Sequence, residues 1–453
     1  MKKRITFRLS TTQIIMLSFL LVILMGSALL SLPVSSADGT PVPYPDALFT
    51  ATTATCVTGL VTVPTGLAWS PFGQAVILVL IQIGGLGVVT VISALMILLN
   101  QRMGIGDRLL IQDAFNLNSL SGIVRFVKNV IAGTFLVEGA GALCYMLVFV
   151  PEYGARGVWI SVFTAVSAFC NAGMDVIGEN SLCDYAANPI VNLTTSLLIV
   201  LGSLGYIVWW DILRVMKKAT PTNRRLFRHL TLHSKIVLVS TLNLLFGGGA
   251  LFLLFEYHNP LTIGHLPLAN KIQVALFQSV TTRTAGFATV PQQYLTNASS
   301  VLSLLLMFIG GSPVGTAGGI KTVTVAVLAL ATWATIRNKN EVSVFERNIS
   351  RQAIRKAVAV TAMAFSILFT ATLLLSAICD ANMLDILFET VSATATVGLS
   401  RDLTPHLNLA GKLIIICTMY LGRVGPISLA LVFNTGKRPP NCIKNPTEEI
   451  SIG

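Results

Sequence analysis

Charged residues are scarce in this sequence: they make up 11% of its 453 residues, while hydrophobic residues make up 53%. An average soluble domain has roughly 25% charged residues, so this composition excludes a soluble protein. The sequence also has no CxxC pair and no HExxH or GxSxG motif. These absences argue against a zinc site and against the common hydrolase sites.

Apolar runs recur along the whole chain, and a helix needs about 20 apolar residues to span a bilayer. The sequence therefore predicts an all-α polytopic membrane protein. Its eight predicted transmembrane spans lie near residues 12–33, 73–99, 126–150, 190–214, 235–256, 299–336, 356–379 and 411–433.

The net charge of +12 is unevenly placed along the chain. Most Lys and Arg residues fall in segments that lie inside the cell if the N-terminus does, which is the positive-inside pattern. Basic residues such as Arg224, Arg228 and Arg351 are therefore interpreted as facing anionic membrane lipid. Nucleic-acid binding is not expected. This pattern predicts a multi-pass protein of the cell inner membrane with both termini in the cytoplasm.

An internal repeat organises the chain. Four short segments each contain a Phe, a run of small and hydroxylated residues, a Gly and a bulky apolar residue; they cover 49–60, 163–174, 277–287 and 388–399. Their glycines, Gly59, Gly173, Gly286 and Gly398, stand at nearly equal intervals, and such self-similarity marks a repeat architecture. We divide the chain into repeat 1 (1–102), repeat 2 (103–218), repeat 3 (219–338), repeat 4 (339–436) and a cytoplasmic tail (437–453).

Each repeat is predicted to contain a span, a short pore helix, an extended return to the outer face and a second span, arranged around a central pore. The pore helices are expected to begin near Asp46, Gly157, Asn270 and Asn382, because Asp and Asn are good helix N-caps. Non-helical backbone at membrane depth is tolerated only when it is buried in protein or lines a water-filled cavity. The repeat therefore requires a central aqueous path.

Backbone carbonyls of the return segments can replace an ion's hydration shell. Glycine can take φ > 0, so its carbonyl can turn towards the axis. No ring of Asp or Glu lines these segments, which favours a dehydrated monovalent cation over calcium. The predicted ion-binding filter comprises the carbonyls of Cys56, Val57, Thr58, Gly59, Cys170, Asn171, Ala172, Gly173, Arg283, Thr284, Ala285, Gly286, Ala395, Thr396, Val397 and Gly398.

A family resemblance rests on these motifs. Thr-Gly-Leu at 58–60, Asn-Ala-Gly at 171–173, Thr-Arg-Thr-Ala-Gly-Phe at 282–287 and the Gly-rich stretch 310–322 resemble the Ktr/Trk/HKT superfamily of potassium transporters, closest to the Ktr membrane subunits, KtrB. A serine at the first filter glycine accompanies sodium preference in that superfamily, so Gly59 implies potassium. The resemblance further implies a homodimer, a cytosolic ring of nucleotide-binding regulatory subunits (KtrA-like) and activation by sodium.

The apolar segment 299–336 is too long for one straight span, and its middle is crowded with Gly and one Pro that should interrupt a helix. We expect an intramembrane loop at 310–319 that obstructs conduction until it is displaced; the alternative is a kink that eases packing. Charge at membrane depth is usually functional, so Arg423 is expected either to hold this loop or to pair with Glu138 or Glu389. Lys321 is expected to reach towards the cytoplasm. The predicted gate comprises Gly310, Gly311, Ser312, Pro313, Gly315, Thr316, Ala317, Gly318, Gly319, Lys321 and Arg423.

Two other functions are weaker alternatives. A gradient-coupled secondary carrier would be expected to have inverted repeats, whereas these four repeats enter in one orientation. A GxGD-type membrane protease is suggested by Gly104-Ile105-Gly106-Asp107, but this motif lies in a basic loop between Arg102 and Arg108. We expect no enzyme activity and no cofactor in this chain beyond the transported potassium ion and activating sodium.

Overall fold

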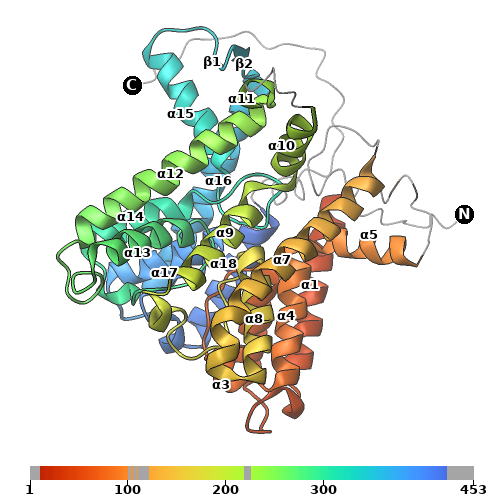
Figure 1. Cartoon of the computed structure of the whole chain (residues 1–453), viewed down its shortest axis with the longest axis vertical. Helices are drawn as coiled ribbons and strands as arrows, with labels where there is room; N and C mark the ends of the chain where they lie inside the picture. Colours follow the sequence, from red (N-terminus) through yellow and green to blue (C-terminus); the bar gives the residue numbers. More distant parts are fainter. Residues whose placement is uncertain are drawn as a thin grey trace, which may run out of the picture.

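The computed structural model describes residues 11–99, 122–218 and 226–425, together with Gly104, Gly106 and Leu109. Its long helices lie side by side, with β1, β2 and α11 at one end of the molecule and α3 at the other (Figure 1). Asp107, the N-terminal residues 1–10 and the predicted tail lie outside the described residues, as do Arg224 and Arg225.

Helices lie in each of the four predicted repeats, and each predicted repeat has one helix at the position of its predicted pore helix. Repeat 1 contains α1 (Thr11–Leu30), the pore helix α2 (Tyr44–Cys56), α3 (Thr65–Ala68), α4 (Pro71–Leu86) and α5 (Val88–Leu98). Repeat 2 contains α7 (Ile123–Tyr153), the pore helix α8 (Ala155–Cys170), α9 (Pro189–Leu204) and α10 (Tyr206–Lys218).

The remaining described helices lie in predicted repeats 3 and 4. Repeat 3 contains α11 (Leu226–His229), α12 (Leu232–Glu256), the pore helix α13 (Leu268–Thr281), α14 (Asn297–Phe308) and α15 (Thr322–Ile336). The antiparallel hairpin of β1 (Ser343–Val344) and β2 (Arg347–Asn348) precedes α16 (Arg351–Ser376), the pore helix α17 (Met383–Ala395) and α18 (Leu409–Val424). We call α4, α9, α14 and α18, the helices that follow the predicted return segments, the inner helices. A short 3-10 turn precedes α9, α14 and α18, at Cys183–Tyr185, Gln292–Tyr294 and Thr404–His406.

Among the described residues, four helices are long and apolar enough to cross a bilayer by themselves: Thr12–Leu30, Ile123–Tyr153, Leu232–Glu256 and Arg351–Ser376. The total is six if two bent pairs each count as one span. The predicted segment 299–336 is divided into α14 and α15, and 411–433 is described only to residue 425.

Two predicted continuous spans, 73–99 and 190–214, are not straight helices. The pairs α4–α5 and α9–α10 bend by 97° and 94°. The bend falls at Gly87 in the first pair and at Gly205 in the second, and both residues have φ of +84°. That backbone conformation cannot continue a right-handed helix and strongly favours glycine, so the chain turns there.

Side chains cap the inner helices, not the pore helices. Ser70, Asn188, Thr296 and Asn408 each accept a hydrogen bond from a backbone N–H in the first turn of α4, α9, α14 and α18. The pore helices instead begin after Pro43, Gly154, Pro267 and Asn382, and none of these four residues makes a side-chain cap bond. The pore helices thus begin within two residues of the predicted starts near Asp46, Gly157, Asn270 and Asn382, but the predicted capping by Asp and Asn side chains was wrong.

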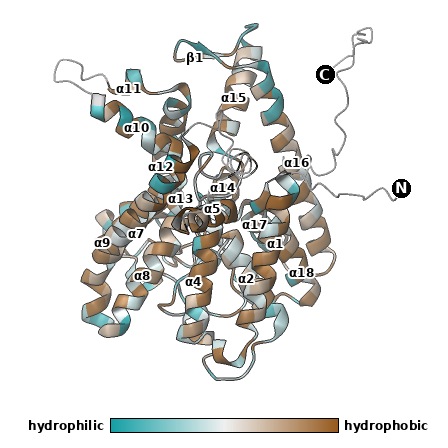
Figure 2. Cartoon of the chain, turned by 90° about the vertical axis from the view of Figure 1, so that its right-hand side faces the viewer, coloured by the Kyte–Doolittle hydropathy of each residue, from teal (hydrophilic) through white to brown (hydrophobic). Residues whose placement is uncertain are grey.

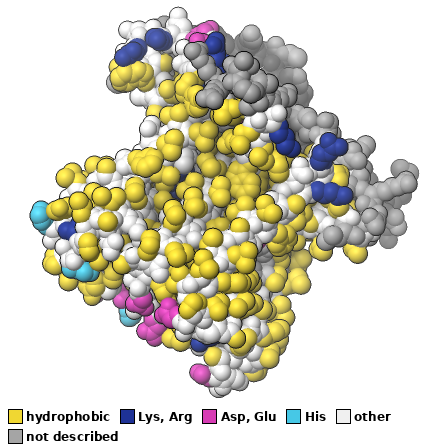
Figure 3. Space-filling view, in the orientation of Figure 1, with side chains coloured by type: hydrophobic (Ala, Val, Ile, Leu, Met, Phe, Trp, Pro, Cys, Tyr) yellow, Lys and Arg dark blue, Asp and Glu magenta, His cyan; other side chains and the backbone are white. Residues whose placement is uncertain are grey.

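The long helices consist mainly of hydrophobic residues, and more hydrophilic residues lie towards the two ends of the molecule (Figure 2). Lys and Arg gather near the end that carries α10, α15 and the hairpin, and Asp and Glu gather towards the opposite end (Figure 3). The inner halves of the pore helices are fully enclosed: Phe49 to Cys56 and Phe388 to Ala395 are all buried. Their buried hydroxyls are partly satisfied within the helix, as in the bond from Thr52 Oγ1 to Leu48 O.

Candidate functional site: a four-segment filter and an intramembrane loop

The four predicted filter glycines meet around one axis. A Cβ added to Gly59 would lie 2.5 Å from Ala172 O, and one added to Gly173 would lie 2.6 Å from Ala285 O. In the same way, a Cβ added to Gly286 would lie close to Val397 O, and one added to Gly398 would lie close to Thr58 O. Each glycine therefore faces the carbonyl that precedes the glycine of the next repeat, which closes a ring in the order 1, 2, 3, 4. Any larger residue would push one segment out of this ring.

Positive φ recurs at two positions in each of the four predicted filter segments. The residue two positions before each glycine has positive φ: +54° at Val57, +60° at Asn171, +66° at Thr284 and +52° at Thr396. The glycines also have positive φ, from +64° to +98°. Non-glycine residues in this conformation cost about 1–3 kcal/mol and persist only when their surroundings enforce them. All four residues belong to the predicted filter, but the sequence did not reveal their positive φ, because Val, Asn and Thr stand at this position in different repeats.

Hydroxyl groups of the predicted pore helices accept hydrogen bonds from backbone amides of the predicted filter segments in three repeats. Gly59 N donates to Thr53 Oγ1 (2.9 Å), Met174 N donates to Ser167 Oγ (3.0 Å) and Gly398 N donates to Ser392 Oγ (3.0 Å). Each of these N–H groups thus has its acceptor in the pore helix of its own repeat, which satisfies a buried backbone donor. Sequence reasoning missed the role of these hydroxyls, although they belong to the hydroxylated run that defined the repeat.

Repeat 3 departs from this pattern. Its pore helix ends at Thr281, and Thr281 Oγ1 donates to Phe287 O (2.6 Å) where the other repeats use a hydroxyl acceptor. Arg283 is 2% exposed, and its guanidinium lies 3.5 Å from Gly310 O. This cation therefore contacts the start of the intramembrane loop.

The loop between α14 and α15 is closed at its base. Ile320 N donates to Phe308 O (3.2 Å), Gly310 N donates to Ile320 O (3.0 Å) and Thr322 N donates to Gly311 O (3.0 Å). The strand-like bridge between Ile309 and Ile320 leaves the enclosed residues as a compact loop, not as a simple kink.

The loop lies against filter residues of other segments. Gly318 N donates to Thr284 Oγ1 (3.1 Å), and Thr316 Oγ1 donates to Asn171 Oδ1 (3.3 Å). A Cβ added to Gly318 would also collide with Thr396 Oγ1. Side chains of three of the four positive-φ residues therefore face this loop, so the predicted filter and the predicted gate form one continuous site.

Two cations bond to loop carbonyls. Arg423 Nη1 donates to Thr316 O (2.6 Å), and its Nη2 donates to Gly84 O in repeat 1. Lys321 Nζ turns back to donate to Ala317 O (2.5 Å), whereas the sequence suggested that it reaches the cytoplasm. Hydrogen bonds from ionised donors are roughly twice as strong as neutral ones. Arg423 thus links the loop of repeat 3 to repeats 1 and 4.

The alternative partners of Arg423 are bonded elsewhere. Glu138 accepts from Gln82 Nε2 (3.2 Å), and Glu389 accepts from Ser400 Oγ (2.8 Å) and Thr404 Oγ1. The ion pairs of the described residues join Arg214 to Asp211, Arg401 to Asp385 and Lys412 to Asp46. The contacts therefore favour loop carbonyls over a carboxylate as the partner of Arg423.

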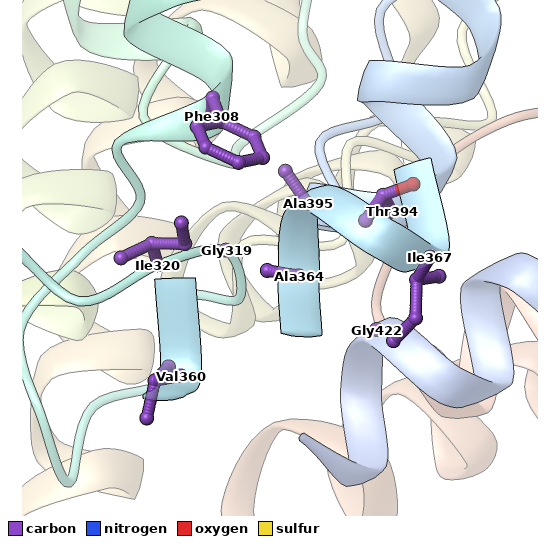
Figure 4. A pocket seen from close by; sticks show the side chains of 9 residues that line it. All are labelled: Phe308, Gly319, Ile320, Val360, Ala364, Ile367, Thr394, Ala395 and Gly422. Atoms are coloured by element: carbon purple, nitrogen blue, oxygen red, sulfur yellow. The ribbon is translucent and has the colours of Figure 1, made fainter. Parts of the chain in front are cut away.

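An apolar pocket lies beside the base of the loop (Figure 4). It holds about 360 Å³ of empty space, its open side included. It is lined by Phe308, Gly319, Ile320, Val360, Ala364, Ile367, Thr394, Ala395 and Gly422. The base of the loop is therefore bordered by small and apolar residues where it faces repeat 4.

One titratable group stands just past the filter of repeat 2. Asp175, two residues beyond Gly173, is buried and accepts from Ile177 N (3.2 Å). Burial raises the pKa of this carboxyl from its ordinary value of 3.8 to about 6. Within the part of the chain that the structure describes, no group of three His, Cys, Asp or Glu side chains is placed to hold a metal ion.

Comparison with known proteins matches residues 2–439 to the family described as TrkH, cation transport protein. The chain belongs to the TrkH family. It is similar to the potassium/sodium uptake protein NtpJ of Enterococcus hirae, with 38% identity over 100% of this chain and 99% of the relative. It is 39% identical to the Ktr system potassium uptake protein B of Bacillus subtilis, over 98% and 97% of the two chains.

The fold agrees with this membership of the TrkH family. The crystal structure of the potassium transporter TrkH from Vibrio parahaemolyticus matches with a TM-score of 0.74 and 17% identity, covering 95% of this chain and 86% of that chain. The resemblance to the Ktr/Trk superfamily seen in the motifs is thus confirmed. These relatives are named as transporters and uptake proteins, so the TrkH-family chain is a membrane transport protein, not an enzyme.

Proposed function

We propose that this chain is the pore-forming membrane subunit of a potassium uptake system. The observation that carries the proposal is the ring of four glycines, each facing a carbonyl of the next repeat. Alternating positive φ along each segment can direct successive carbonyls to one side, where they replace the hydration shell of a monovalent cation. The two similar relatives are named as potassium or potassium/sodium uptake proteins.

In this proposal the loop at 310–319 is the gate. It contacts Asn171 and Thr284, so it stands in the path of an ion that leaves the filter towards the cytoplasm. Arg423 contributes in two ways: it bonds Thr316 O, and its positive charge opposes a cation at the same depth. Displacement of the loop would open the path.

The arrangement of the protein in the cell is also part of the proposal. The basic end around α10, α15 and the hairpin faces the cytoplasm of an inner membrane, because Lys and Arg are retained on that side (Figure 3). Eight spans would place both termini there. A second copy of the chain and a cytosolic nucleotide-binding regulatory ring are the proposed partners, in keeping with the Ktr system named for a relative. Sodium is the proposed activator.

Potassium uptake can be tested directly. The chain is expressed in cells that lack their own potassium uptake systems, with and without a KtrA-like partner and with and without sodium. We expect growth at low external potassium, and we expect Gly59→Ser to admit sodium more readily than the unchanged chain does. The proposal would be overturned if the purified protein, reconstituted in liposomes, transported neither potassium nor rubidium. Flux that does not differ between potassium and sodium would remove the filter assignment.

A further inference from the structure

The inner helices of repeats 1 and 2 break in the same way. Gly87 follows α4 with φ +84° and ψ +135°, and Gly205 follows α9 with φ +84° and ψ +138°. The helix pairs bend by 97° and 94°. The two breaks are therefore nearly identical in backbone geometry, which makes any difference between their surroundings informative.

The break of repeat 2 is bonded to the intramembrane loop through its backbone. Ser312 N donates to Ser203 O (2.9 Å), Thr316 N donates to Gly202 O (3.1 Å) and Tyr206 N donates to Val314 O (3.1 Å). A helix end leaves backbone groups without intrahelical partners, and here the loop supplies partners for both sides of the break. We call residues 202–206 the repeat 2 break.

The glycine of this break is fitted to the loop. A Cβ on Gly205 would collide with Pro313 O, whereas a Cβ on Gly87 would have Thr90 Oγ1 at 3.8 Å as its nearest neighbour. The two glycines thus share one conformation but differ in what lies beside them.

The loop is strained where it meets the break. Val314, whose carbonyl accepts from Tyr206 N, has φ of +63°. Positive φ is a genuine outlier for a β-branched residue, and such strain persists only when surrounding contacts enforce it. The contact with repeat 2 therefore holds the loop in a shape that it would leave if released.

The helix beyond the break continues to the basic end of the molecule. Asp211 on α10 accepts from Thr231 N (2.8 Å) and Ser234 Oγ (2.7 Å) at the start of α12. A movement of α10 would therefore change the position of the break and of the repeat 3 residues bonded to it.

We propose that the repeat 2 break is the positioning element that holds the intramembrane loop against the filter. The expected change in ion flux rests on the proposed function of the loop as a gate. The holding of the loop does not rest on that function, because backbone hydrogen bonds hold the loop whether or not it is a gate.

The test compares Gly205→Ala with its matched control, Gly87→Ala. Both variants place a Cβ at the same positive φ and nearly the same ψ, so both carry the same backbone strain. Of the two, Gly205→Ala is the variant that collides with the loop. Hydrogen–deuterium exchange of the peptide that covers 312–318 is measured by mass spectrometry in lipid nanodiscs, and potassium flux is measured in liposomes.

We expect exchange in this peptide to become faster by about tenfold in Gly205→Ala, which corresponds to about 1.4 kcal/mol, and to stay unchanged in Gly87→Ala. Potassium flux should rise only in Gly205→Ala. Unchanged exchange in Gly205→Ala, or equal acceleration in both variants, would overturn the proposal. Faster exchange without higher flux would leave the holding role intact and would contradict the gate function instead.

A second variant acts in the opposite direction and keeps the test available if Gly205→Ala does not fold. Val314→Asn retains a side chain but replaces a β-branched residue by one that tolerates positive φ. The bound shape of the loop should then be less strained, so exchange in 312–318 should become slower and flux should fall. Faster exchange in Val314→Asn would contradict the inference that strain at this contact favours release.

Discussion

The filter and the intramembrane loop lie in contact, yet they are held in different ways. Most filter bonds come from within the same repeat: Gly59 bonds Thr53, and Gly398 bonds Ser392. The loop is closed at its base within repeat 3, but its middle is bonded to other repeats, through Arg423 and through the carbonyls of Gly202 and Ser203. Local bonds survive when the repeats shift relative to one another, whereas bonds between repeats do not. The filter can therefore keep its shape while the loop changes position.

The largest expected effect is on the filter itself. Gly59→Ala should reduce potassium flux by at least about tenfold, because the left-handed conformation costs an L residue roughly 1–2 kcal/mol and each 1.4 kcal/mol is about tenfold. The added Cβ also lies 2.5 Å from Ala172 O. Flux into liposomes is the measurement. Gly39→Ala is the control, because Gly39 has φ of +69° but nothing within 4 Å of an added Cβ. Equal losses in both variants would argue against the ring.

The next effect tests the bonds that cross between repeats. Arg423→Ala should raise potassium flux severalfold without changing the preference for potassium over sodium, because hydrogen bonds to charged groups contribute about 1.5–3 kcal/mol. Flux and ion competition are measured together. Arg401→Ala is the control, since Arg401 bonds Asp385 and Ser300 away from the loop. If flux stays unchanged both in Arg423→Ala and in a chain with a shortened 311–318 segment, the loop is not a gate.

A smaller effect separates selectivity from gating. Thr53→Val keeps the shape of the side chain but leaves Gly59 N without its acceptor, at a cost of about 1–3 kcal/mol. The ratio of potassium to sodium flux should fall, and exchange in the loop peptide should not change. Thr52→Val is a matched control because the Thr52 hydroxyl bonds Leu48 O within the same helix. A fall of the same size in Thr52→Val would mean that helix packing, not the filter amide, sets the ratio.

The smallest expected effect concerns pH at the outer side of the filter. Asp175 has a pKa of about 6, above its ordinary value of 3.8. The carboxyl is thus mostly neutral at about pH 5 and mostly charged at about pH 7, and the added negative charge near the filter should strengthen potassium binding as pH rises. The native state holds this proton more tightly than the unfolded chain does. The free energy of unfolding should therefore fall as the pH rises over the same range.

The measurement is the KM for potassium between about pH 5 and about pH 7, the range in which this carboxyl changes charge. Asp175→Asn should remove most of the pH dependence, whereas Glu179→Gln, which changes an exposed carboxylate in the same loop, should leave it. A pH profile that is the same in Asp175→Asn as in the unchanged chain would contradict the assignment.

How much the sequence could predict depends on whether a feature is repeated. Gly59, Gly173, Gly286 and Gly398 occur at regular spacing, so their register is visible in the sequence alone. The break at Gly205 is not visible in the sequence, because residues 202–206 read as part of one apolar run. Only the three-dimensional arrangement brings this break to the loop.

The hydrogen-bond partners of the charged side chains were also harder to predict than the positions of those side chains in the sequence. Arg423 was identified from its cost at membrane depth, but its choice of carbonyls over Glu138 depends on distances that no sequence spacing encodes. Lys321 illustrates the same limit: a long flexible side chain can reach either towards water or back to Ala317 O. The predicted caps of the pore helices failed for another reason, since proline or glycine precedes three of these helices.

The bridge between Ile309 and Ile320 has a consequence for how such a protein can diversify. With its two ends fastened together, the segment between them can gain or lose residues while α14 and α15 stay in place. The entropic penalty for a longer closed loop is small, about 0.6 kcal/mol for each doubling of length. The rate of ion flux could thus be changed by insertions and deletions in this loop, while the ion preference set by the four glycines stays the same.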